Sequence, residues 1–133
     1  MKGLKPLFSE ATPEWPKDLY AALDKEFHFD FDPCQPNVVW DGLAADWTGK
    51  RVYCNPPYGR HVWKWIAKAT EADVAVYLLP ARTDTAWFHD YGLKANEIRF
   101  FRGRLRFNKD HRIEPRYDDN AAPFPSLLLV FRK

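Results

Sequence analysis

An uninterrupted apolar run, Val74-Ala75-Val76-Tyr77-Leu78-Leu79, limits how this chain can fold more than any other feature. A run of this length without a polar residue is typical of a strand buried on both faces, as in parallel sheets covered by helices. Pro80 follows, and proline lacks the amide N–H that the interior of a strand uses for pairing. The run therefore predicts a central strand of an α/β protein, ending near residue 80.

Helical and extended patterns alternate around this strand. Apolar residues recur with helical spacing over residues 19–27 and 62–69, and residues 83–93 also indicate a helix. Short strands are predicted at 28–32, 51–54, 98–101, 104–107 and 127–131. This order favours an α/β fold, a compact sandwich whose sheet is mostly parallel with antiparallel C-terminal strands. With 133 residues, 46% of them apolar, we expect residues 1–133 to form one domain around one core.

Composition narrows the class of protein. Cys34 and Cys54 form neither a disulfide framework nor a zinc pattern, and the four histidines are scattered, so we expect free thiols and no metal. No apolar stretch approaches the roughly 20 residues that span a bilayer, and the start of the chain lacks the apolar core of a signal peptide. We therefore expect a cytoplasmic protein without a membrane partner.

Three loops follow predicted strands that share a direction. They are Asp32-Pro33-Cys34, Asn55-Pro56-Pro57-Tyr58 and Pro80-Ala81-Arg82-Thr83. Ligands of open α/β sheets bind beyond the carboxyl ends of the strands. The three loops therefore predict a site at one edge of the sheet.

The second loop has the composition needed to methylate an aromatic amine. The lone pair of such an amine is delocalised, so a site must accept hydrogen bonds from its N–H groups and favour a tetrahedral nitrogen. Asn55 would supply an amide oxygen and Pro56 a backbone carbonyl, while Pro56 and Pro57 stiffen the loop. Tyr58 would stack on a base extruded from the duplex. The alternative is an ordinary Pro-Pro turn with Tyr58 packed on the surface.

The tetrapeptide resembles the signature of methyltransferases that act on amino groups of adenine, cytosine or protein glutamine. Its context is more specific. The segments in order are Phe29–Cys34, Asp41-Gly42-Leu43 with Trp47, Cys54–Gly59, Leu79–Thr85 with Trp87-Phe88-His89, Gly103–Phe107 and Ala122–Ser126. Together they resemble the small phage and prophage DNA N6-adenine methyltransferases, related to the Dam-type enzymes, over roughly residues 9–131. The resemblance implies a Rossmann-like fold, S-adenosylmethionine as cofactor, and DNA as partner with its target adenine flipped out.

The resemblance also assigns a cofactor pocket. Asp32, Pro33 and Cys34 match the family's first nucleotide-binding loop, Asp41 the acidic position that follows, and Thr12 and Pro13 the N-terminal segment; Asn55 would also face the cofactor. The first loop departs from general methyltransferases because it has no glycine through residue 37. Solvated turns or helix caps are the alternative roles for Asp32 and Asp41.

A basic segment from Arg99 to Arg116 indicates contact with DNA phosphates. The residues expected to contact DNA are Arg60, Arg82, Arg104, Arg106, Lys109, Arg112 and Arg116. A solvated strand face would also explain alternating arginines. Phe124 matches an aromatic residue of the family's target-base pocket, with core packing as the alternative. Trp65 fits the buried face of the helix at 62–69 and Trp63 does not, so an exposed Trp63 is a candidate for stacking.

Two rival functions stay open. Protein-glutamine and RNA methyltransferases use the same four residues, but they generally carry an extra substrate-binding domain and a glycine-containing cofactor loop. A non-catalytic DNA-binding relative would explain the missing glycine but not the intact signature. The resemblance alone suggests protection of phage DNA from restriction. The sequence leaves the recognition site open, as well as the choice between a monomer and a weak dimer.

Overall fold

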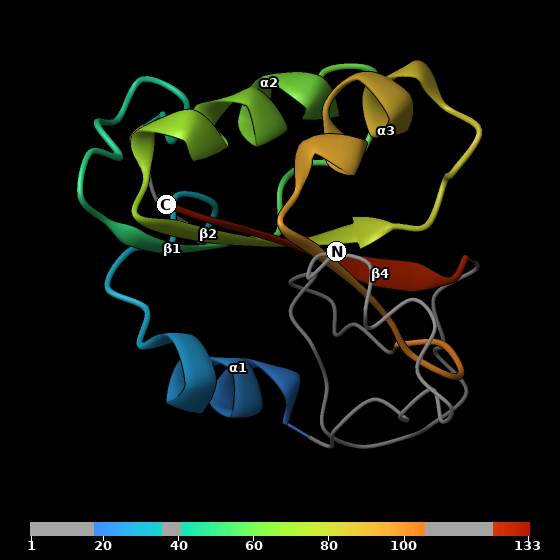
Figure 1. Cartoon of the computed structure of the whole chain (residues 1–133), viewed down its shortest axis with the longest axis horizontal. Coiled ribbons are helices and arrows are strands. Elements are labelled where there is room, and N and C mark those ends of the chain that lie inside the picture. Colours follow the sequence, from blue (N-terminus) through green and yellow to red (C-terminus); the bar gives the residue numbers. More distant parts are fainter. Residues whose placement is uncertain (1–17, 36–40, 106–123) are drawn as a thin grey trace.

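The computed structural model describes residues 18–35, 41–105 and 124–133. Within these ranges the strands form one mixed sheet with the order β1-β2-β4-β3, covered by helices on both faces (Figure 1). The strands are β1 (Arg51–Cys54), β2 (Val74–Pro80), β3 (Glu97–Phe100) and β4 (Ser126–Arg132). The helices are α1 (Leu19–Phe27), α2 (Val62–Ala67) and α3 (Ala86–Asp90), with 3-10 turns η2 (Lys68–Glu71) and η3 (Gly92–Lys94).

Strand β2 lies in the interior of the sheet, as its apolar run predicts, and all of its residues are buried. It pairs in parallel with β1 and antiparallel with β4, which also pairs antiparallel with β3. The α/β class and the antiparallel C-terminal strand are thus confirmed. The described sheet is mixed: β1, β2 and β3 point in one direction, and β4, which lies between β2 and β3, points the other way and makes both of its pairings antiparallel. Such a pairing joins residues far apart in the chain, which local patterns do not encode.

Each face of the sheet has its own apolar cluster. On one face, Leu19, Leu23 and Phe27 of α1 pack against alternate residues of β2 and β4. On the other face, α2 and α3 contribute the buried residues Val62, Trp65, Ile66 and Phe88. Figure 1 shows α1 below the sheet and α2 and α3 above it. The two predicted helical faces at 19–27 and 62–69 are confirmed.

Three predicted elements are shorter or interrupted. The strand at 28–32 is reduced to one bridge, which pairs Phe31 with Val52. The helix at 83–93 is divided into α3 and η3. Arg104 and Leu105 are not in a strand, and the rest of the predicted strand 104–107 lies outside the described residues. In each case a short segment follows its tertiary contacts rather than its own pattern.

An ion-pair network joins α1 to β3 and β4. The guanidinium of Arg99 donates to both carboxylate oxygens of Glu26, at 2.7 and 2.6 Å, and also to Glu97. Arg132 also donates to Glu97, and the guanidiniums of Arg99 and Arg132 lie 5.2 and 5.9 Å from the centre of the Phe27 ring. The hydrogen bond from Arg99 lowers the pKa of Glu26 below its ordinary value. The network therefore has a structural role, and the charge of Arg99 is already paired with Glu26 and Glu97.

The Glu26 contact makes stability depend on pH. A carboxyl group whose pKa is lowered by folding stabilises the protein above its unfolded pKa, and this contribution is lost as the pH falls through the folded pKa. We expect the Glu26→Gln variant to have a lower free energy of unfolding at pH 7, by less than about 1 kcal/mol because the pair is partly exposed. The difference from wild type should shrink as the pH falls below about 4.5, the ordinary pKa of the group. Urea unfolding at several pH values measures it, and a difference that stays constant would contradict the assignment.

Candidate active site

The tetrapeptide Asn55-Pro56-Pro57-Tyr58 directly follows the carboxyl end of β1. Cys54 pairs with Tyr77 in the parallel register, so Asn55 leaves the sheet beside Leu78 of β2. The Tyr58 hydroxyl donates a hydrogen bond of 2.7 Å to Oδ1 of Asn55 and lies 3.4 Å from the carbonyl oxygen of Leu78. Pro56 is buried, whereas Asn55 and Tyr58 are half-buried. The loop therefore presents a fixed amide close to the surface.

The ring of Tyr58 has its own partners. Phe124 meets it edge-on, with ring centres 5.7 Å apart and planes at 79°. The guanidinium of Arg82 lies 5.5 Å from the centre of the Phe124 ring. Burial, and to a smaller extent Cys54, raises the pKa of Tyr58, so its hydroxyl keeps its proton. Three residues predicted for substrate binding or catalysis thus form one connected group.

The loop Asp32-Pro33-Cys34 lies beside the start of this tetrapeptide. The Phe31–Val52 bridge and a 3.0 Å bond from the Tyr53 amide to the Phe31 carbonyl align it with β1. Oδ1 of Asp32 accepts from the Cys34 amide at 3.0 Å, which holds the turn. Cys34 and Cys54 are both free thiols, as predicted. Burial is the main cause that raises the pKa of the Cys54 thiol, with the hydrogen-bonded Cys34 adding to it.

The Asp41 segment packs directly on this first loop. A Cβ atom on Gly42 would lie 2.2 Å from the carbonyl oxygen of Pro33, so only glycine allows the contact. Oδ1 of Asp41 accepts from the Leu43 amide at 2.9 Å, and its side chain is exposed. The indole Nε1 of Trp47 donates to the Gly42 carbonyl at 3.0 Å. The first loop lacks a glycine of its own. Gly42, in the neighbouring segment, lets the two backbones come close together at Pro33.

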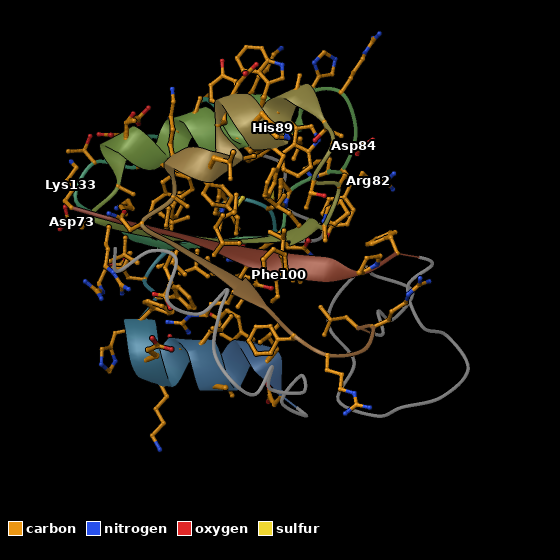
Figure 2. All side chains as sticks on the ribbon, turned by 45° about the vertical axis from the view of Figure 1, so that its right-hand side comes forward. Asp73, Arg82, Asp84, His89, Phe100 and Lys133 are labelled. Atoms are coloured by element: carbon orange, nitrogen blue, oxygen red, sulfur yellow. The ribbon has the colours of Figure 1, made fainter. Side chains whose placement is uncertain are left out.

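The loop after β2 lies at the same end of the sheet, at the carboxyl ends of β1 and β2. The Ala81 amide donates to the Pro125 carbonyl at 2.8 Å, which extends the pairing of β2 with β4 toward Phe124. Thr85 caps α3, and a ring nitrogen of His89 lies 2.8 Å from the Thr83 carbonyl oxygen. Figure 2 shows Arg82 and Asp84 at this end and Asp73 and Lys133 at the opposite end. The three loops predicted to share one edge do so.

The other end of the molecule has an open depression of about 510 Å³. Glu26, Arg51, Asp73 and Lys133 are among the residues that line it. It lies at the starts of β1 and β2, away from the tetrapeptide at their carboxyl ends. It therefore plays no part in the site described above.

The remaining predicted residues are distributed as follows. Arg60 and Arg104 are exposed, and the Arg60 side chain lies 3.3 Å from that of His61. Trp65 is buried and Trp63 is 38% exposed, as predicted, and Trp63 stacks on Tyr91 with ring centres 5.6 Å apart. Outside the described residues lie Thr12, Pro13, Arg106, Lys109, Arg112 and Arg116.

Two features of the site were not anticipated from the sequence. The first is the Tyr58 hydroxyl, since only its ring had a predicted role, and the second is Gly42. A glycine directly after Asp41 was a visible signal, but its contact with Pro33 depends on tertiary packing. Within the described part of the chain, no helix has the length and apolar character needed to cross a membrane.

Comparison with known proteins supports one family. The model of the family DNA N-6-adenine-methyltransferase (Dam) matches residues 10–133, which is nearly the whole chain. Searches of curated proteins and of solved structures found no match. The matched range includes the tetrapeptide, both loops that pack beside it, and the Phe124 segment. The chain therefore belongs to the Dam family of DNA N-6-adenine-methyltransferases.

Proposed function

We propose that this chain transfers a methyl group from S-adenosylmethionine to the N6 amine of adenine in DNA. The observation that carries this proposal is the Asn55 amide, hydrogen-bonded to Tyr58 at the carboxyl end of β1. It lies in a stiff proline loop next to two acidic turns. Family membership supplies the class of reaction. We infer that residues 1–133 form one compact Rossmann-like methyltransferase domain.

The proposed chemistry depends on acceptors that face the amine. Oδ1 of Asn55 and the carbonyl of Pro56 would accept the two N–H bonds of the adenine amine and direct its lone pair toward the methyl donor. Both acceptors gain strength as positive charge develops on the nitrogen, which lowers the energy of the transition state. The rings of Tyr58 and Phe124 would contact the flipped base. S-adenosylmethionine, when bound, supplies the electrophilic methyl group.

The charge of the two acidic turns fits this cofactor. Asp32 and Asp41 lie on loops that touch through Pro33 and Gly42. Carboxylates suit a ligand that carries sulfonium and ammonium charges and donating hydroxyls. We propose Asp32, Pro33, Cys34, Asp41 and Asn55 as its binding residues. Thr12 and Pro13 stay proposals from the family resemblance.

We propose that cationic residues around this edge hold the DNA backbone. Arg82 and Arg104 are exposed, and reversing both charges (Arg82→Glu with Arg104→Glu) should weaken binding to a duplex at low salt. The slope of log affinity against log salt should become shallower by about 2, close to 0.9 per lost phosphate contact. A control with the same charge change, Lys25→Glu with Lys133→Glu, should leave the slope unchanged. Fluorescence anisotropy measures the DNA affinity at each salt concentration. Equal slopes in both double variants would contradict this interface.

Acceptor specificity separates the proposal from its rivals. Labelled S-adenosylmethionine is incubated with the chain and, in turn, unmethylated duplex DNA, RNA and a protein extract, while calorimetry measures cofactor binding. Transfer to DNA supports the proposal. Transfer only to RNA or protein supports the alternative methyltransferases, and absence of both transfer and cofactor binding supports a non-catalytic DNA-binding relative. A phage or prophage origin, action in the host cytoplasm and protection from restriction are proposed from the resemblance alone.

A further inference from the structure

The hydroxyl of Tyr58 contacts the group on which the proposed reaction depends. We propose that Tyr58 is a positioning residue: its hydroxyl holds the Asn55 side chain so that the amide oxygen, and not the NH₂ group, faces the target amine. This inference rests on the proposed function and assigns a second task to a residue whose ring is expected to stack on the base. It is based on the 2.7 Å bond from Tyr58 to Oδ1 of Asn55.

An asparagine side chain needs such a device for this chemistry. Its oxygen and its NH₂ group are similar in size but opposite in hydrogen-bonding polarity. If the amide turned over, two N–H donors would oppose the N–H donors of the substrate amine. An amide oxygen can accept two hydrogen bonds, so a bond from Tyr58 is compatible with a second bond from the amine.

The surroundings make Tyr58 a rigid anchor. The Leu78 carbonyl, part of buried strand β2, lies 3.4 Å from the hydroxyl, and Phe124 holds the ring edge-on. The raised pKa keeps the hydroxyl protonated, so it stays a donor across the working pH range. Because the hydroxyl lies between the Leu78 carbonyl and Oδ1 of Asn55, it relates the position of the Asn55 oxygen to the sheet.

Ring and hydroxyl can be separated by substitution. Tyr58→Phe keeps a ring of the same shape and removes only the hydroxyl. If Tyr58 acts by stacking alone, this variant should transfer methyl groups as fast as the wild type. If the hydroxyl positions Asn55, we expect kcat to fall about tenfold, the effect of roughly 1.4 kcal/mol. The KM for DNA should change less than about twofold, because the ring still contacts the base.

A carboxylate at position 55 provides the matched control. Its two oxygens are equivalent, so Asn55→Asp retains an acceptor that has no wrong orientation. Adding Tyr58→Phe to Asn55→Asp should therefore cost only about twofold in kcat, against tenfold in the Asn55 background. Such a difference is the signature of two residues that act as a unit. Equal costs in both backgrounds would overturn the inference.

A spectroscopic measurement separates this inference from the proposed function. The side-chain NH₂ signals of Asn55, identified by their loss in Asn55→Asp, are recorded by ¹⁵N–¹H NMR in wild type and Tyr58→Phe. We expect them to shift or broaden in the variant, with its melting temperature within a few degrees of wild type. Unchanged signals would overturn the positioning role whether or not the protein methylates DNA. If the signals shift in Tyr58→Phe but the wild type has no transferase activity, the orienting bond stands and the proposed function is rejected.

Discussion

Asn55→Ala is expected to lower kcat for methyl transfer by about 100- to 1000-fold, the usual effect of removing one preorganised group that stabilises the transition state. The substitution removes Oδ1, the acceptor proposed for one N–H of the amine. It also removes the partner of the Tyr58 hydroxyl, whose hydrogen bond measures 2.7 Å. Single-turnover kinetics with labelled cofactor measure the change without interference from product release.

The matched control is Asn55→Asp, which keeps an oxygen at the same place and should retain more activity than the alanine variant. Calorimetry should show that Asn55→Ala still binds S-adenosylmethionine within about tenfold of wild type, since the acidic turns remain. An alanine variant that transfers methyl groups at the wild-type rate would remove Asn55 from the mechanism.

Trp47→Ala is expected to lower the free energy of unfolding by about 3–5 kcal/mol, as large-to-small changes at buried aromatic residues do. Trp47 is fully buried and meets the rings of Phe31 and Tyr77 at centre distances of 6.4 Å. The ammonium of Lys68 lies 5.4 Å from the centre of the indole ring. A loss of this size is a large part of the free energy of unfolding of a typical domain, which is about 5–15 kcal/mol.

The same substitution should weaken cofactor binding, because the Trp47 indole holds the Gly42 carbonyl and so supports the contact with Pro33. Trp47→Phe keeps most of the apolar surface and loses this hydrogen bond, so about 1–3 kcal/mol should be lost. Trp63→Ala, at a position that is 38% exposed, should cost less than about 1 kcal/mol. Urea unfolding of the three variants tests this order of losses in the free energy of unfolding. Equal losses for Trp47→Ala and Trp63→Ala would contradict the central place of Trp47 in the core.

The parts of the fold that were predictable are those with a strong local pattern. The apolar run of β2 and the helical faces of α1 and α2 bury the residues that the sequence indicates. The place of β4 between β2 and β3 was not predictable from local patterns. Residues of β4 pair with Glu97 of β3 and Val74 of β2, which lie more than about 30 residues earlier in the chain. The same applies to the Arg99–Glu26 pair, whose members are 73 residues apart.

The candidate site shows a similar division. The proposed chemistry of the tetrapeptide follows from residue type, and the common location of the three loops follows from the ends of the predicted strands. The distances that give the site its organisation do not. The Tyr58 hydroxyl reaches Asn55 because the proline loop turns back, and Gly42 reaches Pro33 because Trp47 is anchored in the core. These contacts depend on packing that no single segment determines.

Identification of the methylated nucleoside shows whether this chain methylates adenine in DNA and whether Asn55 takes part. Unmethylated duplex DNA is incubated with S-adenosylmethionine and either wild type or Asn55→Ala, digested to nucleosides, and analysed by mass spectrometry. We predict N6-methyladenine from the wild type and a loss of at least about 100-fold in the variant. A wild-type digest without N6-methyladenine, or the same yield from both proteins, would contradict the assignment of adenine methylation to this site.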